Sequence, residues 1–135
     1  MTMPGAIPYL TVKDGEAALA FYERAFAAKT ENKMKADDGK RLLHASLTIN
    51  GGPLMLSDDF PEFGDSGGTK EPGRLGGTPV TVHLDVVDAD AVFDKAVGAG
   101  ASIVMPLENQ FWGQRFGKLK DPFGHVWSIG GPLKK

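Results

Sequence analysis

One order of local sequence patterns occurs twice in this chain of 135 residues, and this repetition limits the possible folds more than any other feature. In each half, an aspartate precedes a helix-like run of apolar residues, and a glycine-containing turn joins two strand-like runs further along. Asp14 and Gly51 are 37 positions apart, and Asp88 and Gly124 are 36 positions apart. The similar spacing predicts two copies of one module.

The first half predicts the order strand, helix, strand, strand, strand. Residues 7–12 alternate in polarity, and after Asp14 the apolar residues Leu19, Tyr22 and Phe26 recur at helical spacing. Three further strands are expected, over residues 30–36, 42–49 and 53–57. The alternation in the second of these predicts one face with Leu43, Ala45, Leu47 and Ile49 and an opposite face with His44, Ser46 and Thr48.

The second half repeats this order. A strand over 81–87 precedes a helix that Asp88 caps and that ends at residues 98–100. Three more strands are expected, over residues 102–105, 111–120 and 125–129, the last two forming a hairpin around Asp121-Pro122-Phe123-Gly124. The predicted organisation is therefore one structural domain with modules at 1–57 and 80–135, joined by a Gly- and Pro-rich linker or lid loop at 58–79.

Composition excludes several classes of function. The net charge is −2 with a pI near 5.9, so a basic surface for nucleic acid is not expected. No run of 18 apolar residues and no secretory signal occur, so we expect a soluble protein that does not enter a membrane. The absence of cysteine excludes thiolate chemistry and disulfides, which fits a cytoplasmic location.

The strands are apolar on one face and polar or aromatic on the other. A curved sheet with such an opposite face is typical of a small-molecule pocket, although a solvated sheet face would carry a similar pattern. The residues expected to bind a ligand are Tyr9, His44, Ser46, Met55, His83, Trp112, Gln114, Arg115 and Ser128.

Several motifs resemble those of a known group of proteins. These are YLTVKD before the helix containing FYERAF, then LMLSDDF, VHLDVVDADAVFDKAVGAGA and WGQRFGKLKDPFGHVWSI. Across essentially the whole chain they resemble the vicinal oxygen chelate superfamily of glyoxalases, bleomycin-resistance proteins and dioxygenases, and within it the PhnB-like branch. The resemblance implies an α+β fold of paired βαβββ modules that form a curved mixed β-sheet cleft, commonly in a homodimer.

The resemblance also identifies the positions where metal-dependent members hold their ion. In this chain those positions carry Ile7, Met55, Thr81 and Ser128. A divalent ion prefers imidazole and carboxylate ligands, so we expect neither a metal nor another cofactor. This departure argues against activities that depend on the metal.

Three hypotheses for function follow. The first is a metal-free protein that binds an unknown small molecule, as bleomycin-resistance proteins do. The second is an enzyme, a lyase, dioxygenase or transferase, that uses His44, His83 and Asp85 on a small oxygenated substrate. The third is a structural or interaction module.

The orientation of Arg115 has two possibilities. Strand alternation from Leu119 places Arg115 on the helix side of the sheet, where an ion pair would hold its side chain. A bulge near Gly117 would instead turn Arg115 into the cleft.

Overall fold

The computed structural model describes residues 2–67 and 69–135, and it consists of two modules with the same element order. The first contains the strands β1 (Tyr9–Val12), β2 (Lys29–Lys35), β3 (Leu42–Ile49) and β4 (Gly52–Asp58) and the helix α1 (Gly15–Phe26). The second contains the strands β5 (Thr81–Asp85), β6 (Ser102–Asn109), β7 (Arg115–Lys120) and β8 (Val126–Gly131) and the helix α3 (Ala89–Ala99). The predicted pair of βαβββ modules is confirmed.

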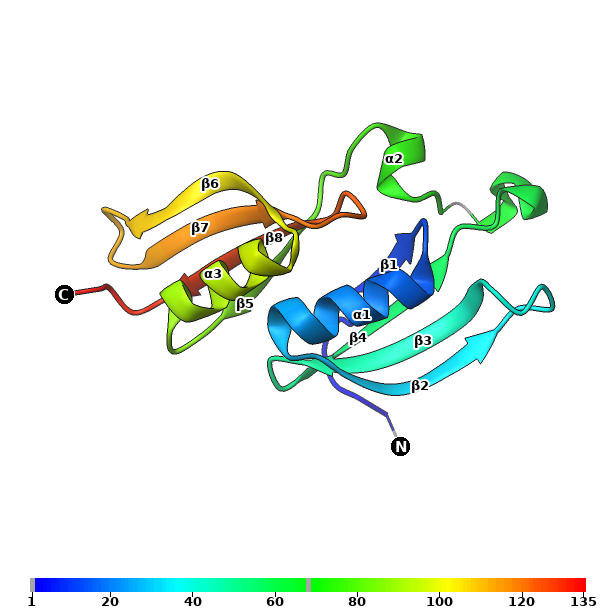
Figure 1. The fold of residues 1–135 in the computed structure, drawn as a ribbon, viewed down its shortest axis with the longest axis horizontal. Helices are drawn as coiled ribbons and strands as arrows, with labels where there is room; N and C mark the ends of the chain where they lie inside the picture. Colours follow the sequence, from blue (N-terminus) through cyan, green and yellow to red (C-terminus); the bar gives the residue numbers. More distant parts are fainter. Residues whose placement is uncertain (1, 68) are drawn as a thin grey trace.

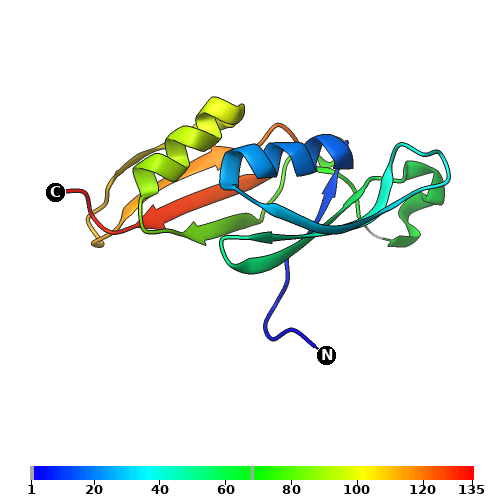
Figure 2. The same cartoon turned by 60° about the horizontal axis from the view of Figure 1, so that its bottom comes forward.

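Each module forms a four-stranded mixed sheet. The strand orders are β1-β4-β3-β2 and β5-β8-β7-β6, in which the first pair of each sheet is parallel and the other pairs are antiparallel. The two modules lie side by side, with α1 next to α3 (Figure 1). Both helices cover the same side of the sheets, so the opposite sheet faces are not covered by a helix (Figure 2).

Both helices begin at the predicted aspartates. The Asp14 carboxylate accepts a hydrogen bond from the Ala17 amide, and the Asp88 carboxylate accepts one from the Ala91 amide, each at 3.1 Å. These bonds satisfy amide groups that have no partner within the helix. The repeated capping residue therefore fixes the same strand-to-helix turn in both modules.

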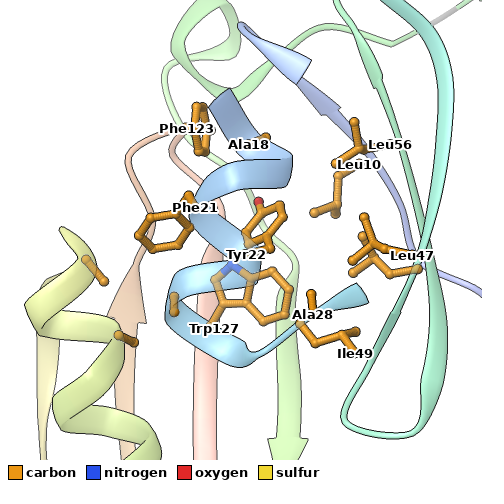
Figure 3. Close-up of a cluster of buried hydrophobic side chains, with 14 of the residues drawn as sticks. Leu10, Ala18, Phe21, Tyr22, Ala28, Leu47, Ile49, Leu56, Phe123 and Trp127 are labelled. Atoms are coloured by element: carbon orange, nitrogen blue, oxygen red, sulfur yellow. The ribbon is translucent and has the colours of Figure 1, made fainter. Parts of the chain in front are cut away.

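A cluster of buried aromatic side chains lies at the boundary between the modules. Tyr22 of α1 packs on Trp127 of β8 with ring centroids 5.3 Å apart, and Phe21 packs on Phe123 at 6.2 Å (Figure 3). Tyr22 and Trp127 have no exposed surface. Burying aromatic side chains of this size stabilises each module against the other, because neither module alone could cover them.

A buried carboxylate joins the modules at the same place. Asp121 accepts hydrogen bonds from the Tyr22 hydroxyl at 2.6 Å, from Trp127 Nε1 at 2.9 Å and from the Phe123 and His125 amides at 2.9 Å each. Burial, and then the nearby Asp121 carboxylate, raise the pKa of the Tyr22 phenol well above 10. The phenol therefore remains a hydrogen-bond donor at neutral pH.

Three details differ from the sequence prediction. Leu42, rather than Leu43, fills the core, because the pairing of β2 with β3 shifts from Met34–His44 to Lys35–Leu42 and leaves Leu43 42% exposed. The strand predicted over 102–105 extends to Asn109, and the one predicted over 111–120 begins only at Arg115 because residues 111–113 form a turn. The segment expected to be loop contains two short helices, η1 (Pro61–Gly67) and α2 (Pro72–Leu75).

Candidate functional site

A pocket of about 680 Å³ lies where residues of the two modules meet. The strands β1 and β5 line it, together with residues from the segment that joins the modules. Most of its lining is apolar, including Ile7, Pro8, Leu75, Val80 and Val82. A pocket of this size and composition can enclose a small organic molecule.

The joining segment is fastened beside this pocket by buried polar contacts. Arg74 of α2 donates to both carboxylate oxygens of Asp59, at 2.7 and 2.9 Å, and the Glu71 amide donates to Asp59 at 2.8 Å. The hydrogen bonds from Arg74 lower the pKa of the Asp59 carboxyl. Gly124, in the turn before β8, has φ +91° and lies so close to Pro72 of α2 that a Cβ atom would come within 2.8 Å of it.

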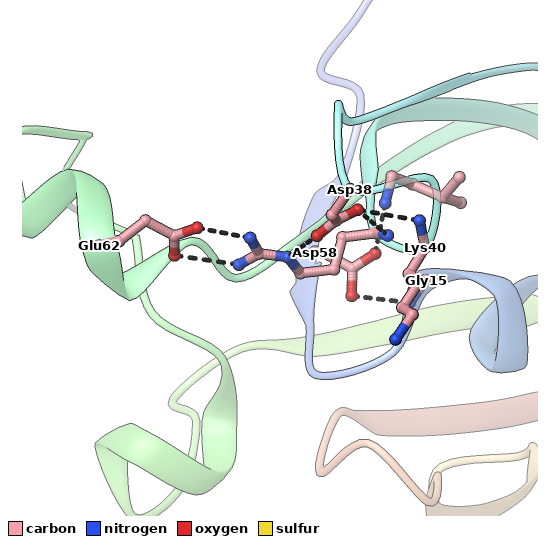
Figure 4. A network of polar contacts seen from close by, with 7 residues as sticks. Gly15, Asp38, Lys40, Asp58 and Glu62 are labelled. Carbon is pink, nitrogen blue, oxygen red and sulfur yellow. Dashed lines mark hydrogen bonds and ion pairs between the residues drawn. The ribbon is translucent and has the colours of Figure 1, made fainter.

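The neighbouring residue Asp58, at the end of β4, makes a similar contact within the first module. The buried Asp58 carboxylate accepts from the Gly15 amide at 3.0 Å and the Leu42 amide at 2.6 Å, and Arg41 bridges Asp38 and Glu62 next to it (Figure 4). Burial raises the pKa of the Asp58 carboxyl.

The open face of the first module brings together four of the predicted ligand-binding residues. Tyr9 on β1 pairs in register with Met55 on β4, which pairs with Ser46 on β3. The Tyr9 hydroxyl forms a 2.8 Å hydrogen bond with Nδ1 of His44. This face presents a phenol, an imidazole, a hydroxyl and a thioether, and none of these side chains belongs to a described ion pair.

The open face of the second module collects most of the other predicted residues. His83 Nδ1 and Ser128 Oγ are hydrogen-bonded at 2.7 Å, and the His83 ring stacks on Phe116 with centroids 5.9 Å apart. Trp112 packs edge-on against Phe116 and donates to Gln114 Oε1 at 3.3 Å. Aromatic rings and hydrogen-bonding groups therefore meet on this face.

Gly130 makes that arrangement possible. A Cβ atom at this position would come within 2.5 Å of Gln114 Nε2 and 2.8 Å of His83 Cε1. The missing side chain lets Gln114 and His83 lie against the sheet, where Gln114 Nε2 also donates to Asp85 at 3.4 Å. Asp85 is thus hydrogen-bonded to Gln114, whereas the His83 ring is hydrogen-bonded to Ser128.

Arg115 lies away from this group. Its guanidinium donates to both oxygens of Asp90 on α3, at 2.7 and 2.8 Å, so the side chain is held on the helix side of the sheet as strand alternation indicated. The hydrogen bond to Arg115 lowers the pKa of the Asp90 carboxyl. Arg115 is therefore not placed to touch a ligand on the open face. Its inclusion among the expected ligand-binding residues was wrong.

Three residues, one in the pocket wall and two on the open face of the second module, did not appear among the expected ligand-binding residues. His125 lines the pocket and donates from Nε2 to the carbonyl of Thr11, which links the modules at 2.8 Å. Phe116 stacks on His83, and Lys118 pairs in register with Ser128. Alternation from the buried Leu119 places Lys118 and Phe116 on the open face, so the sequence carried this signal.

The residues at the expected metal positions do not fit a metal ion. Ile7 has no donor atom, and Met55 offers only a thioether. The Ser128 hydroxyl is 3% exposed and bonded to His83, and Thr81 supplies a neutral hydroxyl. In the described part of the chain, no three His, Asp or Glu side chains lie close enough together to hold a metal ion.

Ser128 and His83 also resemble a nucleophile–base pair in distance. A serine that attacks a substrate must be reachable, and Ser128 is 3% exposed. The pair is therefore better suited to fixing the His83 ring than to nucleophilic attack.

No helix within residues 2–67 and 69–135 is long and apolar enough to cross a membrane.

Comparisons with known proteins agree with this architecture. The sequence model of the Glyoxalase/Bleomycin resistance protein/Dioxygenase superfamily matches residues 6–129. The uncharacterized protein Mb0911c of Mycobacterium bovis is 48% identical over 132 residues, which cover 98% of this chain and 86% of that protein.

Solved structures show the same fold. The PhnB protein from Bacillus cereus has a TM-score of 0.71 at 21% identity, covering 95% of this chain and 99% of that one. The fosfomycin resistance protein FosX from Listeria monocytogenes, in complex with Mn(II) and sulfate, has a TM-score of 0.69 at 15% identity, covering 98% of this chain and 93% of that one. With its paired modules and matching sequence, the chain belongs to the Glyoxalase/Bleomycin resistance protein/Dioxygenase superfamily.

Proposed function

We propose that this protein binds a small organic molecule, without a metal, in the pocket between β1 and β5. The observation that carries the proposal is the pocket itself, about 680 Å³ with a largely apolar lining and Tyr9, His83 and His125 at its wall. Binding needs shape, apolar contact and a few placed hydrogen-bonding groups, and all are present without any catalytic group. An interaction module, in contrast, would be expected to fill this space with its own side chains.

A pocket-filling variant tests this proposal. Thr81 is exposed and lines the pocket, so Thr81→Phe should occupy the space and abolish binding of hits from a fragment screen followed by ligand-observed NMR. Ser102 stands at the other edge of the same sheet, also exposed, so Ser102→Phe is the matched control and should leave binding unchanged. Equal binding by both variants would place the ligand elsewhere.

A second candidate is an enzyme, and the placement of His83 favours it. The ring is exposed, oriented by Ser128 and supported by Phe116, which is what a general base requires. Asp85 would not orient this histidine, because its hydrogen bond is with Gln114. Turnover of any bound hit that falls by orders of magnitude in His83→Ala, with affinity changed little, would favour the enzyme over the binding protein.

We also propose that the chain forms a homodimer through exposed apolar side chains on and beside its open sheet faces, outside the row of His83, Ser128 and Lys118. Both helices lie on one side, and large apolar side chains on or beside the open faces stay exposed, among them Tyr9 at 54%, Met34 at 58% and Trp112 at 49%. Light scattering after size-exclusion chromatography should give twice the chain mass of 14.4 kDa. A monomer at micromolar concentration would refute the dimer and leave the pocket within one chain untouched.

A further inference from the structure

The charge around the pocket is one-sided, and this extends the proposed function to a class of ligand. None of the described residues that line the pocket is an aspartate or glutamate. The lining side chains that can carry positive charge are His83 and His125, besides Lys70, which interacts with the Asp59 carboxylate. A negative group would therefore meet no carboxylate in the lining.

A lysine continues this pattern across the sheet. The register pairs His83 with Ser128, Ser128 with Lys118 and Lys118 with Met105, so these side chains form one row over the four strands of the second module. Lys118 is half-buried, and within the described ranges it takes part in no ion pair. Arg115, on the same strand, is paired with Asp90 on the other side of the sheet. Lys118 and Lys120 are thus the cations of this strand on the open face, and Lys118 is the one in the same row as His83.

Carboxylates do occur on this face, but in the next row. That row contains Asp85, Gly130, Phe116 and Glu108, about 7 Å further along the strands. Asp85 already accepts from Gln114. The open face of the second module is therefore basic in the row of Ser128 and acidic in the row of Phe116. An anion would be stable only in the row of Ser128.

We infer that the ligand is an apolar organic acid whose anionic group lies on the open face between the side chains of His83 and Lys118, which flank the buried Ser128. Its apolar body extends into the pocket against Ile7, Pro8 and Val82. The inference rests on the proposed binding function and adds the ligand's charge. A charge-assisted hydrogen bond is worth more than a neutral one by an amount that corresponds to about tenfold in affinity.

Matched pairs of probes test the inference. Carboxylic acids and their primary amides, such as 2-naphthoate and 2-naphthamide, have nearly the same shape and differ in charge. In a panel of such pairs measured by ligand-observed NMR and calorimetry, the acids should bind the unmodified protein about tenfold more tightly than the amides. Lys118→Gln should abolish this preference, and Lys118→Arg should retain much of it.

The control variant removes the same charge from the opposite side of the molecule. Lys95 lies exposed on α3, so Lys95→Gln should keep the full preference for acids. Amides that bind as well as acids, or a preference that survives in Lys118→Gln, would overturn the inference while the binding function stands. If neither acids nor amides bind, the proposed binding function fails together with the inference about the ligand's charge. Circular dichroism of each variant establishes that it is folded.

Discussion

The two modules carry equivalent rows of side chains on their open faces, and the rows differ in charge. Counted from the capping residues Asp14 and Asp88, Tyr9 corresponds to His83, and counted from the turn glycines, Met55 corresponds to Ser128. The pairing register of the strands extends each pair into a row. The two rows are Tyr9, Met55, Ser46 and Asn32 in the first module, and His83, Ser128, Lys118 and Met105 in the second. Identical backbone pairing thus supports an uncharged row in one module and a basic row in the other.

The buried carboxylates differ in a similar way. Asp58 of the first module accepts two backbone amides from its own module. Asp121 of the second module accepts four hydrogen bonds, one of them from Tyr22 in the first module. The repeat therefore keeps the strands and helices, while the second module supplies both the charged face and the connection between modules.

The largest predicted effect is the loss of Asp121. Asp121→Ala leaves four buried donors without their acceptor and should lower the free energy of unfolding by about 3–5 kcal/mol in urea denaturation. Asp58→Ala removes two bonds and should cost about 2 kcal/mol. Asp94 is exposed on α3, and Asp94→Ala is the control that should change little. Equal losses for Asp58 and Asp121 would break the comparison between the modules.

Removing only the bond across the boundary should have a smaller effect. Tyr22→Phe keeps the ring against Trp127 and deletes the hydroxyl, at an expected cost of about 1–3 kcal/mol. Because the folded-state pKa of Tyr22 is raised above 10, this contribution is complete below about pH 10 and declines above it. Tyr9→Phe, on the open face, is the matched control. A loss from Tyr9→Phe as large as that from Tyr22→Phe would contradict the assignment.

Two adjacent carboxyls at the end of the first module should respond to pH in opposite directions. The pKa of Asp58 is raised by burial, so the stability it contributes should be complete below about pH 4 and fall as pH rises above that. The pKa of Asp59 is lowered by Arg74, so its contribution should be complete above about pH 4 and be lost as pH falls. Unfolding free energies of Asp58→Asn and Asp59→Asn, each compared with the unmodified protein across this range, measure both trends. Parallel trends would exclude the described contacts.

The smallest effect is expected for the ion pair on the helix side of the second module. Arg115→Gln removes the guanidinium from Asp90, both partners being partly exposed, so thermal unfolding should shift less than in Tyr22→Phe. Binding of acidic probes should not change, because Arg115 points away from the open face. A loss of binding as large as in Lys118→Gln would show that this arginine reaches the ligand.

Periodicity predicted most of the fold, because it is a local property of the chain. Both capping aspartates, both helices and the apolar faces of Leu54, Trp127 and Ile129 follow from spacing alone. Spacing did not predict that Leu42 is buried in place of Leu43, because a bulge depends on the pairing partner β2 as well as on the strand itself.

The sequence predicted which face of the sheet each candidate site residue lies on, but not the pocket that the two modules form together. Alternation placed Tyr9, His44, His83 and Ser128 on the polar faces, and the structure shows their mutual contacts. The pocket between β1 and β5 depends on how two edges distant in sequence approach each other, and no local pattern encodes that distance. The same alternation also places Lys118 on the open face. A lysine on a strand near the surface has the same pattern as any solvated side chain, so the sequence did not single it out.

The boundary core has a consequence for the symmetry of the molecule. Counted from the same reference residues, Tyr22 corresponds to Ala96, and Trp127 corresponds to Leu54. All four are buried, and the two large rings pack on each other, while their counterparts Ala96 and Leu54 are smaller. A chain built from two first modules would bring two tyrosines and no tryptophan to this boundary, and two second modules would bring two tryptophans and no tyrosine. The halves have become complementary, and neither can substitute for the other.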